Sequence, residues 1–279
     1  MNEKLSWTVT QSQRLRELNA PQHMHDHLFS SEKERNESFL ELERTYVRKS
    51  RQQLRKLRDE RRRPKLCALE DTLAQALIKI GFVQVVTPIL ISKSSLDKMS
   101  IRPGHKLSKQ VFWLGGKKCL RPMLAPNLYH LLQELVKIWE KPVRIFEVGP
   151  CFRKDSGGRY HVNEFTMLNL VELGLPQGKG RTRLEELVSV IMDASGIKDY
   201  KSVPHKSEVY GTTIDFVSEF ELASGVVGPH ALDSRWGIND PWVGVGFGLE
   251  RLLMVREHYR NVQRAGRTLI YLDGERLNV

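Results

Sequence analysis

The 279-residue sequence has few cysteines, no long apolar run and no internal repeat. Its three cysteines, Cys67, Cys119 and Cys151, are unclustered and lack metal-ligand spacing, so we expect them to be reduced and mostly buried. This excludes a disulfide framework. No apolar run reaches the roughly 20 residues of a membrane-spanning helix, and the N-terminal stretch lacks the apolar core of a signal peptide. We therefore expect a soluble, cytoplasmic protein without a membrane partner.

Acidic residues are scarce in one basic segment. The formal charge of the chain is +11, and residues 44–65 hold eleven Lys or Arg against two acids, a net charge of +9. The remainder is nearly balanced. A solvated charged helix is the ordinary interpretation of such a run, but this imbalance is too large for self-neutralising pairs one helical turn apart. A polyanion, most simply RNA, is the partner that the segment favours.

Two regions differ in their patterns. Short and long helices are expected at residues 6–20 and 31–63, and Pro64 ends the basic stretch. We therefore predict a basic helical arm over residues 1–65 and a separate folded domain over residues 66–279.

The second region mixes amphipathic helices with strands. Helices are predicted at residues 66–80, 126–140 and 181–196, the second of them with Leu128, Leu132 and Ile138 facing inward. The strand patterns lie in residues 81–92, in the hairpins 110–122 and 144–173, in 212–229, and in 242–259, where a glycine-rich strand leads into a helix. Pro88 interrupts the first of them, which suggests an edge position or packing between subunits. Because hairpins outnumber helical crossovers, we predict an α+β fold with a mainly antiparallel sheet flanked by helices.

The hairpin at 144–173 carries polar residues where a structural hairpin does not need them. Its apolar first strand breaks into Arg153-Lys154-Asp155, a Gly157-Gly158 turn follows, and Asn169 lies among apolar neighbours on the return strand. In isolation, such an arginine is more often a solvent-facing ion-pair partner, and such an amide is a satisfied core residue.

Three motifs in this order resemble the signature of class II aminoacyl-tRNA synthetases. They are a helix and strand that end at Thr87-Pro88, the FRKD segment at 152–155, and the GFGLERLL segment at 246–253. Residues 120–129, 145–170 and 242–253 narrow the resemblance to the pyrrolysyl-tRNA synthetases, and the basic arm is similar to that of the bacterial split type. The resemblance covers most of residues 66–279. It implies the class II synthetase fold, with a tRNA-contacting arm over residues 1–65 and a catalytic domain over residues 66–279.

The resemblance implies that ATP contacts four side chains: Arg153, Arg251, His161 and Phe165. Arg153 would contact the α-phosphate and the amino-acid carboxylate, and Arg251 would contact the γ-phosphate. His161 would reach the terminal phosphates, and Phe165 would stack on adenine. Planar guanidinium groups suit phosphate recognition.

The resemblance also implies a Mg²⁺ site. Glu221 and Ser224 match the metal-binding pair of the family, and both offer the hard oxygen ligands that Mg²⁺ prefers. Asp155 stands where the class usually has glutamate. We expect it to remain an ATP contact in spite of its shorter side chain.

A large apolar pocket for pyrrolysine is implied as well. Asn169 would hydrogen-bond the amide carbonyl of the substrate side chain, and Tyr210 would cap the pocket from a mobile hairpin. Such a pocket disfavours lysine, whose ammonium would lose hydration without a carboxylate partner. The remaining lining residues by resemblance are Ala125, Leu128, Tyr129, Leu132, Val171 and Trp242.

The expected partners are the pyrrolysine suppressor tRNA, a second copy of the chain in a homodimer and, as in the split type, a separately encoded N-terminal tRNA-binding protein. The arginines expected to contact tRNA are Arg55, Arg58, Arg61 and Arg62. Two alternatives stay open: a class II-like ligase for another bulky lysine derivative, and a non-catalytic RNA-binding paralogue. The second should have lost Arg153, Glu221 or Arg251, which this sequence retains.

Overall fold

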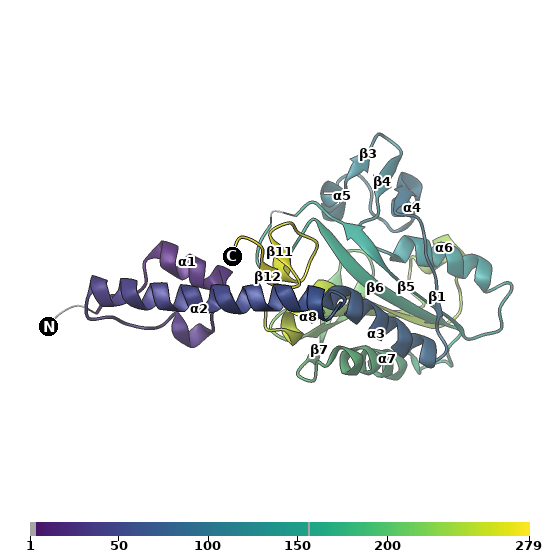
Figure 1. The fold of residues 1–279 in the computed structure, drawn as a ribbon. Coiled ribbons are helices and arrows are strands. Elements are labelled where there is room, and N and C mark those ends of the chain that lie inside the picture. Colours follow the sequence, from purple (N-terminus) through teal and green to yellow (C-terminus); the bar gives the residue numbers. More distant parts are fainter. Residues whose placement is uncertain (1–3, 156) are drawn as a thin grey trace.

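A computed structural model describes residues 4–155 and 157–279 (Figure 1). The helices of the described residues are α1 (Val9–Glu17), α2 (Glu32–Asp59), α3 (Lys65–Lys79), α4 (Lys93–Lys98), α5 (Lys106–Gln110), α6 (Ala125–Leu135), α7 (Gly180–Ser195) and α8 (Leu249–Arg256), with 3-10 turns η1 (Gln22–Met24), η2 (Asp233–Trp236) and η3 (Val262–Arg264). The strands are β1 (Val83–Gln84), β2 (Leu90–Ser92), β3 (Trp113–Leu114), β4 (Lys118–Leu120), β5 (Val143–Phe152), β6 (Glu164–Leu173), β7 (Lys201–Ser207), β8 (Gly211–Val217), β9 (Glu221–Gly228), β10 (Trp242–Gly248), β11 (Tyr271–Leu272) and β12 (Glu275–Arg276).

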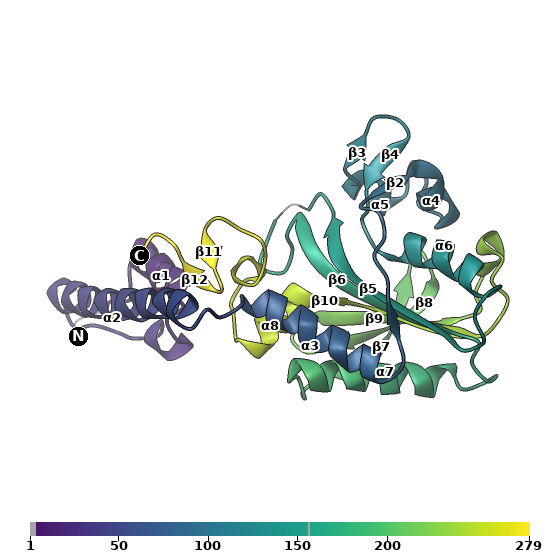
Figure 2. The same ribbon diagram turned by 45° about the vertical axis from the view of Figure 1, so that its right-hand side comes forward.

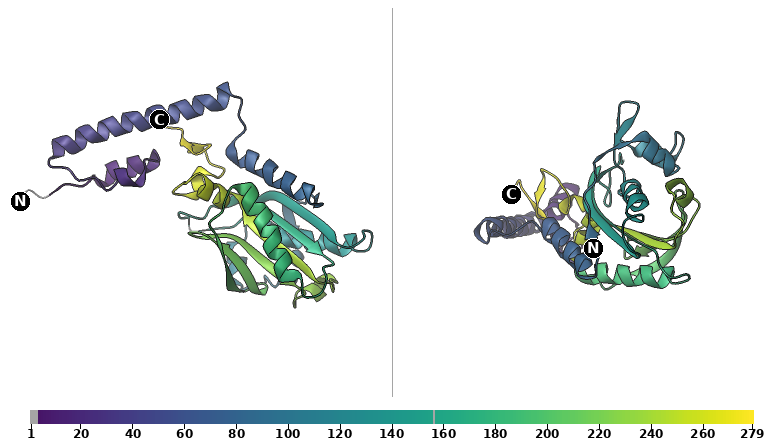
Figure 3. Two further views of the ribbon diagram at one scale, coloured as in Figure 1. Left: turned by 90° about the horizontal axis from the view of Figure 1, so that it is seen from below. Right: turned by 90° about the vertical axis from the view of Figure 1, so that its right-hand side faces the viewer.

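The N-terminal helices form an arm that extends away from the body (Figures 1 and 3). Thr8 begins α1 with a capping box, and the hydroxyl of Ser31 accepts from the first turn of α2. A small core of its own includes Trp7, Leu15 and Phe29. The predicted helices at residues 6–20 and 31–63 are thus confirmed with shorter ends. Residues 1–3 of the predicted arm lie outside the described residues.

The C-terminal segment lies between arm and body, with β11 and β12 beside α2 (Figure 2). Arg276 pairs with Glu17 at 2.6 Å, and the hydroxyl of Ser50 donates to the carboxylate of Glu275 at 2.5 Å. The first contact holds α1, and the second holds the basic helix α2, against the C-terminal segment.

The body is built on a seven-stranded sheet in the order β1-β5-β6-β10-β9-β8-β7. All neighbouring strands in it run antiparallel except β1 and β5. The predicted α+β fold with a mainly antiparallel sheet is therefore confirmed. The prediction of one interrupted strand over 81–92 is wrong. Its first part, β1, forms an edge of the large sheet, whereas β2 pairs with β4 in a separate three-stranded sheet. Pro88 lies in the connection, which suits its missing N–H.

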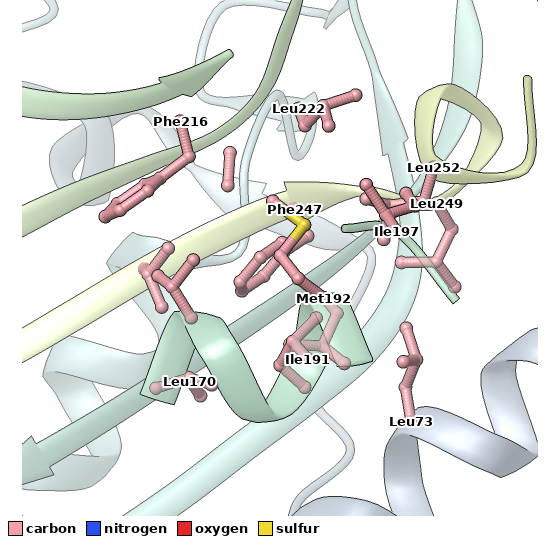
Figure 4. Packing of buried hydrophobic residues seen from close by; sticks show 14 of the residues in the cluster. Leu73, Leu170, Ile191, Met192, Ile197, Phe216, Leu222, Phe247, Leu249 and Leu252 are labelled. Atoms are coloured by element: carbon pink, nitrogen blue, oxygen red, sulfur yellow. The ribbon is translucent and has the colours of Figure 1, made fainter. Parts of the chain in front are cut away.

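The two faces of the large sheet bury different clusters, because strand side chains alternate in direction. Leu170 and Phe247 face α7 and pack near Met192 (Figure 4). Val171 follows Leu170 on β6, and Trp242 lies five positions before Phe247 on β10, so both face the opposite side. They belong to a second cluster that includes residues of α6. Each such burial stabilises the fold by roughly 1.5–3 kcal/mol. The sheet therefore separates a helix-backed core from the side on which α6 lies, as the right-hand view of Figure 3 shows.

Two further predictions meet the structure in detail. The hairpin over 144–173 is confirmed as β5 and β6, joined by a loop in which Gly157 and Gly158 have φ of 76° and 149°. The helix predicted over 126–140 ends earlier, at Leu135, and Ile138 is 75% exposed, so its inward position was wrong. Lys141-Pro142, a cis peptide bond, lies between this helix and β5.

Within the described residues, the longest helix, α2, is too polar to cross a membrane, and the more apolar helices are too short. Cys119 and Cys151 are buried and Cys67 is half-buried, all as free thiols, as predicted.

Candidate active site

A cavity of about 760 Å³ opens on the α6 side of the sheet. All the side chains predicted for ATP, metal and amino acid line it, although they come from α6, β6, β9, β10, α8, the loop between β5 and β6 and the turn between β7 and β8. They are Ala125, Leu128, Tyr129, Leu132, Arg153, Asp155, His161, Phe165, Asn169, Val171, Tyr210, Glu221, Ser224, Trp242 and Arg251.

Strand β10 forms the floor of the cavity by alternating residue size. Val243, Val245 and Phe247 are buried in the helix-backed core. Glycines occupy the opposite face, and a Cβ at Gly246 would lie 2.9 Å from Oδ1 of Asn169 on β6. The glycine-rich pattern therefore provides space for a ligand.

Strand β6 contributes one face to the cavity by the same alternation. Phe165, Met167, Asn169 and Val171 all line it. Because they are two residues apart, they project from one side of the strand over about 20 Å. The predicted adenine contact and the predicted amino-acid contact are therefore arranged along a single strand.

The cationic end of the cavity is centred on Arg251. Its guanidinium donates to the carbonyl of Glu221 at 3.0 Å and to Nε2 of His161 at 3.0 Å. A second contact joins it to the Glu221 carboxylate at 3.7 Å. The bond to His161 requires an unprotonated Nε2. These contacts gather His161 and Glu221 around the Arg251 guanidinium and leave part of its positive charge uncompensated.

Arg153 faces the same end from the end of β5. Its Nε donates to the carbonyl of Pro122 at 2.8 Å, and its guanidinium carbon lies 5.3 Å from the centre of the Phe165 ring. Burial lowers the pKa of Arg153 from its ordinary value, and the charge of Arg251 acts in the same direction. Two guanidinium groups that share a cavity favour an anionic ligand.

The predicted metal pair lies on β9 beside a buried acid that the sequence reasoning missed. Ser224 donates from its Oγ to Oδ1 of Asp215 at 2.7 Å, and Asp215 is 7% exposed. The lone pairs of the Ser224 hydroxyl are thereby left for another donor or a cation. The Glu221 carboxylate is half-exposed. These hard oxygen atoms fit Mg²⁺.

The other end of the cavity is aromatic. Tyr129 stacks on Trp236 with ring centres 5.3 Å apart and meets Trp242 edge-on at 5.6 Å. The hydroxyl of Tyr129 and Nε1 of Trp242 donate to the buried carboxylate of Asp233 at 3.0 and 2.8 Å. Their polar atoms are thus occupied by Asp233, which leaves apolar ring surface to line the cavity.

Asn169 is the exception at this end. Its Oδ1 is buried and has no hydrogen-bond partner among the described residues. A buried amide oxygen without a donor costs about 1–3 kcal/mol. Its position on the cavity wall favours a ligand that supplies a hydrogen bond there.

The comparisons with known proteins decide the family. The model of the tRNA synthetases class II core domain (F) matches residues 19–271. The chain belongs to the class II aminoacyl-tRNA synthetase family. The crystal structure of pyrrolysyl-tRNA synthetase from Desulfitobacterium hafniense is similar to this chain, with 52% sequence identity and a TM-score of 0.93. The match covers 98% of this chain and 99% of that one. Within the class, this chain therefore belongs with the pyrrolysyl-tRNA synthetases, as the resemblance predicted.

More distant class II relatives share only part of their length with the chain. The histidine--tRNA ligase of Sulfolobus acidocaldarius is 26% identical over 48% of this chain and 32% of its own length. The chain thus spans about a third of that relative. A prolyl-tRNA synthetase structure from Giardia lamblia, at 14% identity and a TM-score of 0.58, covers 68% of this chain and 44% of its own, and shares the fold.

Several residues of this synthetase site escaped the sequence reasoning. Asp233 and His230 both contact the hydroxyl of Tyr129, which lies more than 100 positions earlier in the chain. Glu250, next to Arg251, is buried and accepts from the backbone N–H of Thr166 at 2.8 and 2.9 Å. No local pattern marks these acids, although Glu250 lies within the motif that was recognised.

The four arginines predicted to contact tRNA lie at the body end of α2 and just beyond it, and all are exposed. They differ in their surroundings. Arg62 pairs with Asp273 at 2.8 Å, and Arg58 with its neighbour Asp59 at 2.7 Å. No ion pair joins the side chains of Arg55 or Arg61 to the described residues. These two are therefore better placed for an external anion.

Proposed function

We propose that this protein activates pyrrolysine with ATP, through an aminoacyl-adenylate, and then ligates it to its cognate amber-suppressor tRNA. The observation that carries the proposal is a single cavity with a cationic end, around Arg153 and Arg251, and an aromatic end, around Tyr129 and Trp242. One end suits a triphosphate and the other a bulky, uncharged side chain.

At the cationic end, the amino-acid carboxylate attacks the α-phosphorus of ATP and pyrophosphate leaves. Both reactants are anions, so positive charge must hold them together and stabilise the transition state. Arg153 binds the α-phosphate and the carboxylate, while Arg251 and His161 bind the terminal phosphates. Phe165 stacks on adenine, and Asp155, whose backbone N–H bonds to Asn163, lies on the loop that reaches the adenine edge.

Glu221 and Ser224 would hold Mg²⁺, which would supply positive charge to neutralise the phosphates. Asp215 accepts a hydrogen bond from the Ser224 hydroxyl, so the serine lone pairs are free to face the cavity. The residues of the chain thereby orient the triphosphate before the carboxylate arrives.

At the aromatic end, Leu128, Leu132 and Val171 add apolar surface to the two rings. Asn169 bonds the side-chain amide of the substrate, and Tyr210 covers the pocket from the β7–β8 hairpin. Lysine is rejected because its ammonium would be buried without a carboxylate partner.

The arm carries the tRNA contacts, mostly to the phosphate backbone, together with a separately encoded N-terminal tRNA-binding protein. A second copy of the chain covers the β1 edge, where Val86 is 88% exposed and Val83 and Leu90 are about half-exposed. We place the homodimer in the cytoplasm with its tRNA.

Amino-acid-dependent ATP–pyrophosphate exchange tests the proposal. The amino acids are pyrrolysine, a bulky Nε-acyl-lysine, lysine and phenylalanine, and Arg153→Ala is the inactive control. Exchange with the first two alone, lost in the control, supports it. Exchange with the acyl-lysine but not with pyrrolysine identifies a ligase for another lysine derivative. No exchange with any of them favours an RNA-binding paralogue.

A further inference from the structure

A buried carboxylate organises the wall of the aromatic end. Asp233 is 1% exposed. Its Oδ1 accepts from the Tyr129 hydroxyl at 3.0 Å, and its Oδ2 accepts from Nε1 of Trp242 at 2.8 Å and from the backbone N–H of His230 at 2.7 Å. A buried carboxylate is tolerated only with such donors. The hydrogen bonds to Asp233 therefore hold both rings in place and stabilise the buried carboxylate.

The hydrogen bonds of His230 determine its tautomer. Nδ1 lies 3.2 Å from the backbone N–H of Leu232, which donates to it, so Nδ1 carries no proton. Burial lowers the pKa of His230 from its ordinary value, although Asp233 acts in the opposite direction. The ring is thus neutral near pH 7, with its proton on Nε2.

The proton on Nε2 sets the direction of the whole chain of bonds. Nε2 lies 3.0 Å from the Tyr129 hydroxyl and 3.5 Å from Oδ1 of Asp233, so the hydroxyl is its nearer acceptor. If Nε2–H donates to that oxygen, the Tyr129 proton is directed to Oδ1 of Asp233, the bond observed at 3.0 Å. Each donor then meets one acceptor. The chain runs from Leu232 N–H through His230 and Tyr129 to Asp233.

The same ring also touches the capping residue. The His230 ring centre is 5.2 Å from that of Tyr210 and 5.4 Å from that of Trp242, both in edge contact. Tyr210 and Trp242 line the cavity, whereas His230 does not. His230 therefore lies behind the wall, where it contacts the cap and two wall residues together.

We infer that His230 is a positioning residue for the amino-acid pocket: through Nε2–H it orients Tyr129, and through its ring it seats Tyr210. This inference rests on the proposed function. It predicts that loss of the Nε2 bond weakens amino-acid binding and leaves ATP binding unchanged, because no group at the cationic end contacts this imidazole.

Three substitutions separate the roles of the ring. His230→Gln places an amide N–H near the position of Nε2, and His230→Asn places an amide oxygen near the position of Nδ1. His230→Phe keeps the ring contacts and removes both hydrogen bonds. Ser234→Ala, an exposed change on η2 four positions further along the chain, is the matched control.

The measurements are KM for the acyl-lysine, KM for ATP and kcat in pyrophosphate exchange, with Tm as a check on folding. We expect KM for the amino acid to rise about tenfold in Asn and Phe variants and less than about threefold in the Gln variant. KM for ATP should stay within about twofold in all of them. In a Tyr129→Phe background the effect of His230→Phe should disappear, because the hydroxyl that connects the two residues is gone.

The outcomes are distinct. A Phe variant equal to wild type, equal losses in the Gln and Asn variants, or a parallel rise in KM for ATP would overturn the inference. If a His230 variant does not fold, comparison of Tyr129→Phe with wild type still decides, since an unchanged KM for the amino acid would leave the chain of bonds without a role. Failure of the proposed function looks different: wild type itself would show no exchange.

Discussion

The two ends of the cavity are held in opposite ways. At the cationic end, Arg251 bonds to a backbone carbonyl, to His161 and to a half-exposed Glu221. At the aromatic end, Tyr129 and Trp242 bond to one carboxylate that water scarcely reaches. The first arrangement consists of contacts that incoming phosphates can replace, and the second of contacts to Asp233, which does not line the cavity.

The difference follows from what each ligand brings. A triphosphate carries enough charge to reorganise the guanidinium groups around it as it binds. A bulky apolar side chain makes no strong directional contacts, so its pocket must be arranged beforehand or lose affinity to the cost of ordering. Substitutions at the two ends should therefore alter different kinetic constants.

The largest expected effect is at the cationic end. Arg153→Ala should lower the rate of pyrophosphate exchange about 10²–10³-fold, because it removes charge stabilisation from the transferring centre. The measurement is kcat for exchange at saturating ATP. Lys154→Ala, which removes a neighbouring exposed cation, should change kcat less than about threefold. Equal losses in both variants would mean that net charge, and not the position of Arg153, is what matters.

The aromatic end should respond through KM for the amino acid. Asn169→Ala removes the unpaired Oδ1 of the cavity wall. We expect KM for the acyl-lysine to rise about 10–30-fold, equivalent to one lost hydrogen bond to a buried group, with KM for ATP almost constant. A rise in KM for ATP of the same size would contradict the separation of the two ends.

The sequence predicted this division where its signals were local. Arg153 follows the first strand of a hairpin, and Asn169 stands in its return strand. Strand alternation and the family motif were therefore enough to predict that both side chains line one cavity. Asp233 could not be found in this way, because its contact with Tyr129 joins residues 104 positions apart. The break between β1 and β2 was missed for a similar reason. Their partners lie in different sheets, and local β propensity does not encode the choice.

Substitutions in the arm test whether either end of the cavity depends on the positive charge of the arm. Arg55→Gln with Arg61→Gln should weaken tRNA binding about tenfold near 0.15 M salt and reduce the salt slope by about 1–2, because phosphate contacts release counterions. Pyrophosphate exchange should not change. The measurement is tRNA affinity at several salt concentrations.

Arg62→Gln is the matched control for that pair. Arg62 already bonds to Asp273, whose side chain is 2% exposed, so its loss should lower Tm as well as remove a positive charge. If Arg62→Gln weakens tRNA binding as much as the double substitution with no change in Tm, the distinction among the four arginines is wrong.

The smallest expected effect concerns Glu250, which ties α8 to β6 behind the cationic end. Burial raises its pKa to about 7, against the hydrogen bonds from Thr166 and the charge of Arg267. The folded state therefore binds this proton more tightly than the unfolded chain, where the pKa is near 4.3. The contribution to stability is complete below that unfolded value and is lost as pH rises through about 7.

Glu250→Gln should remove this dependence while keeping an oxygen that accepts from Thr166. Between about pH 6 and pH 7.5, the free energy of unfolding of wild type should fall about 1 kcal/mol more than that of the variant. Urea unfolding at both pH values measures the difference, and histidines that titrate in both proteins cancel. Parallel pH profiles would mean that Glu250 is ionised in the fold, and that the cationic end is supported by a charged rather than a protonated neighbour.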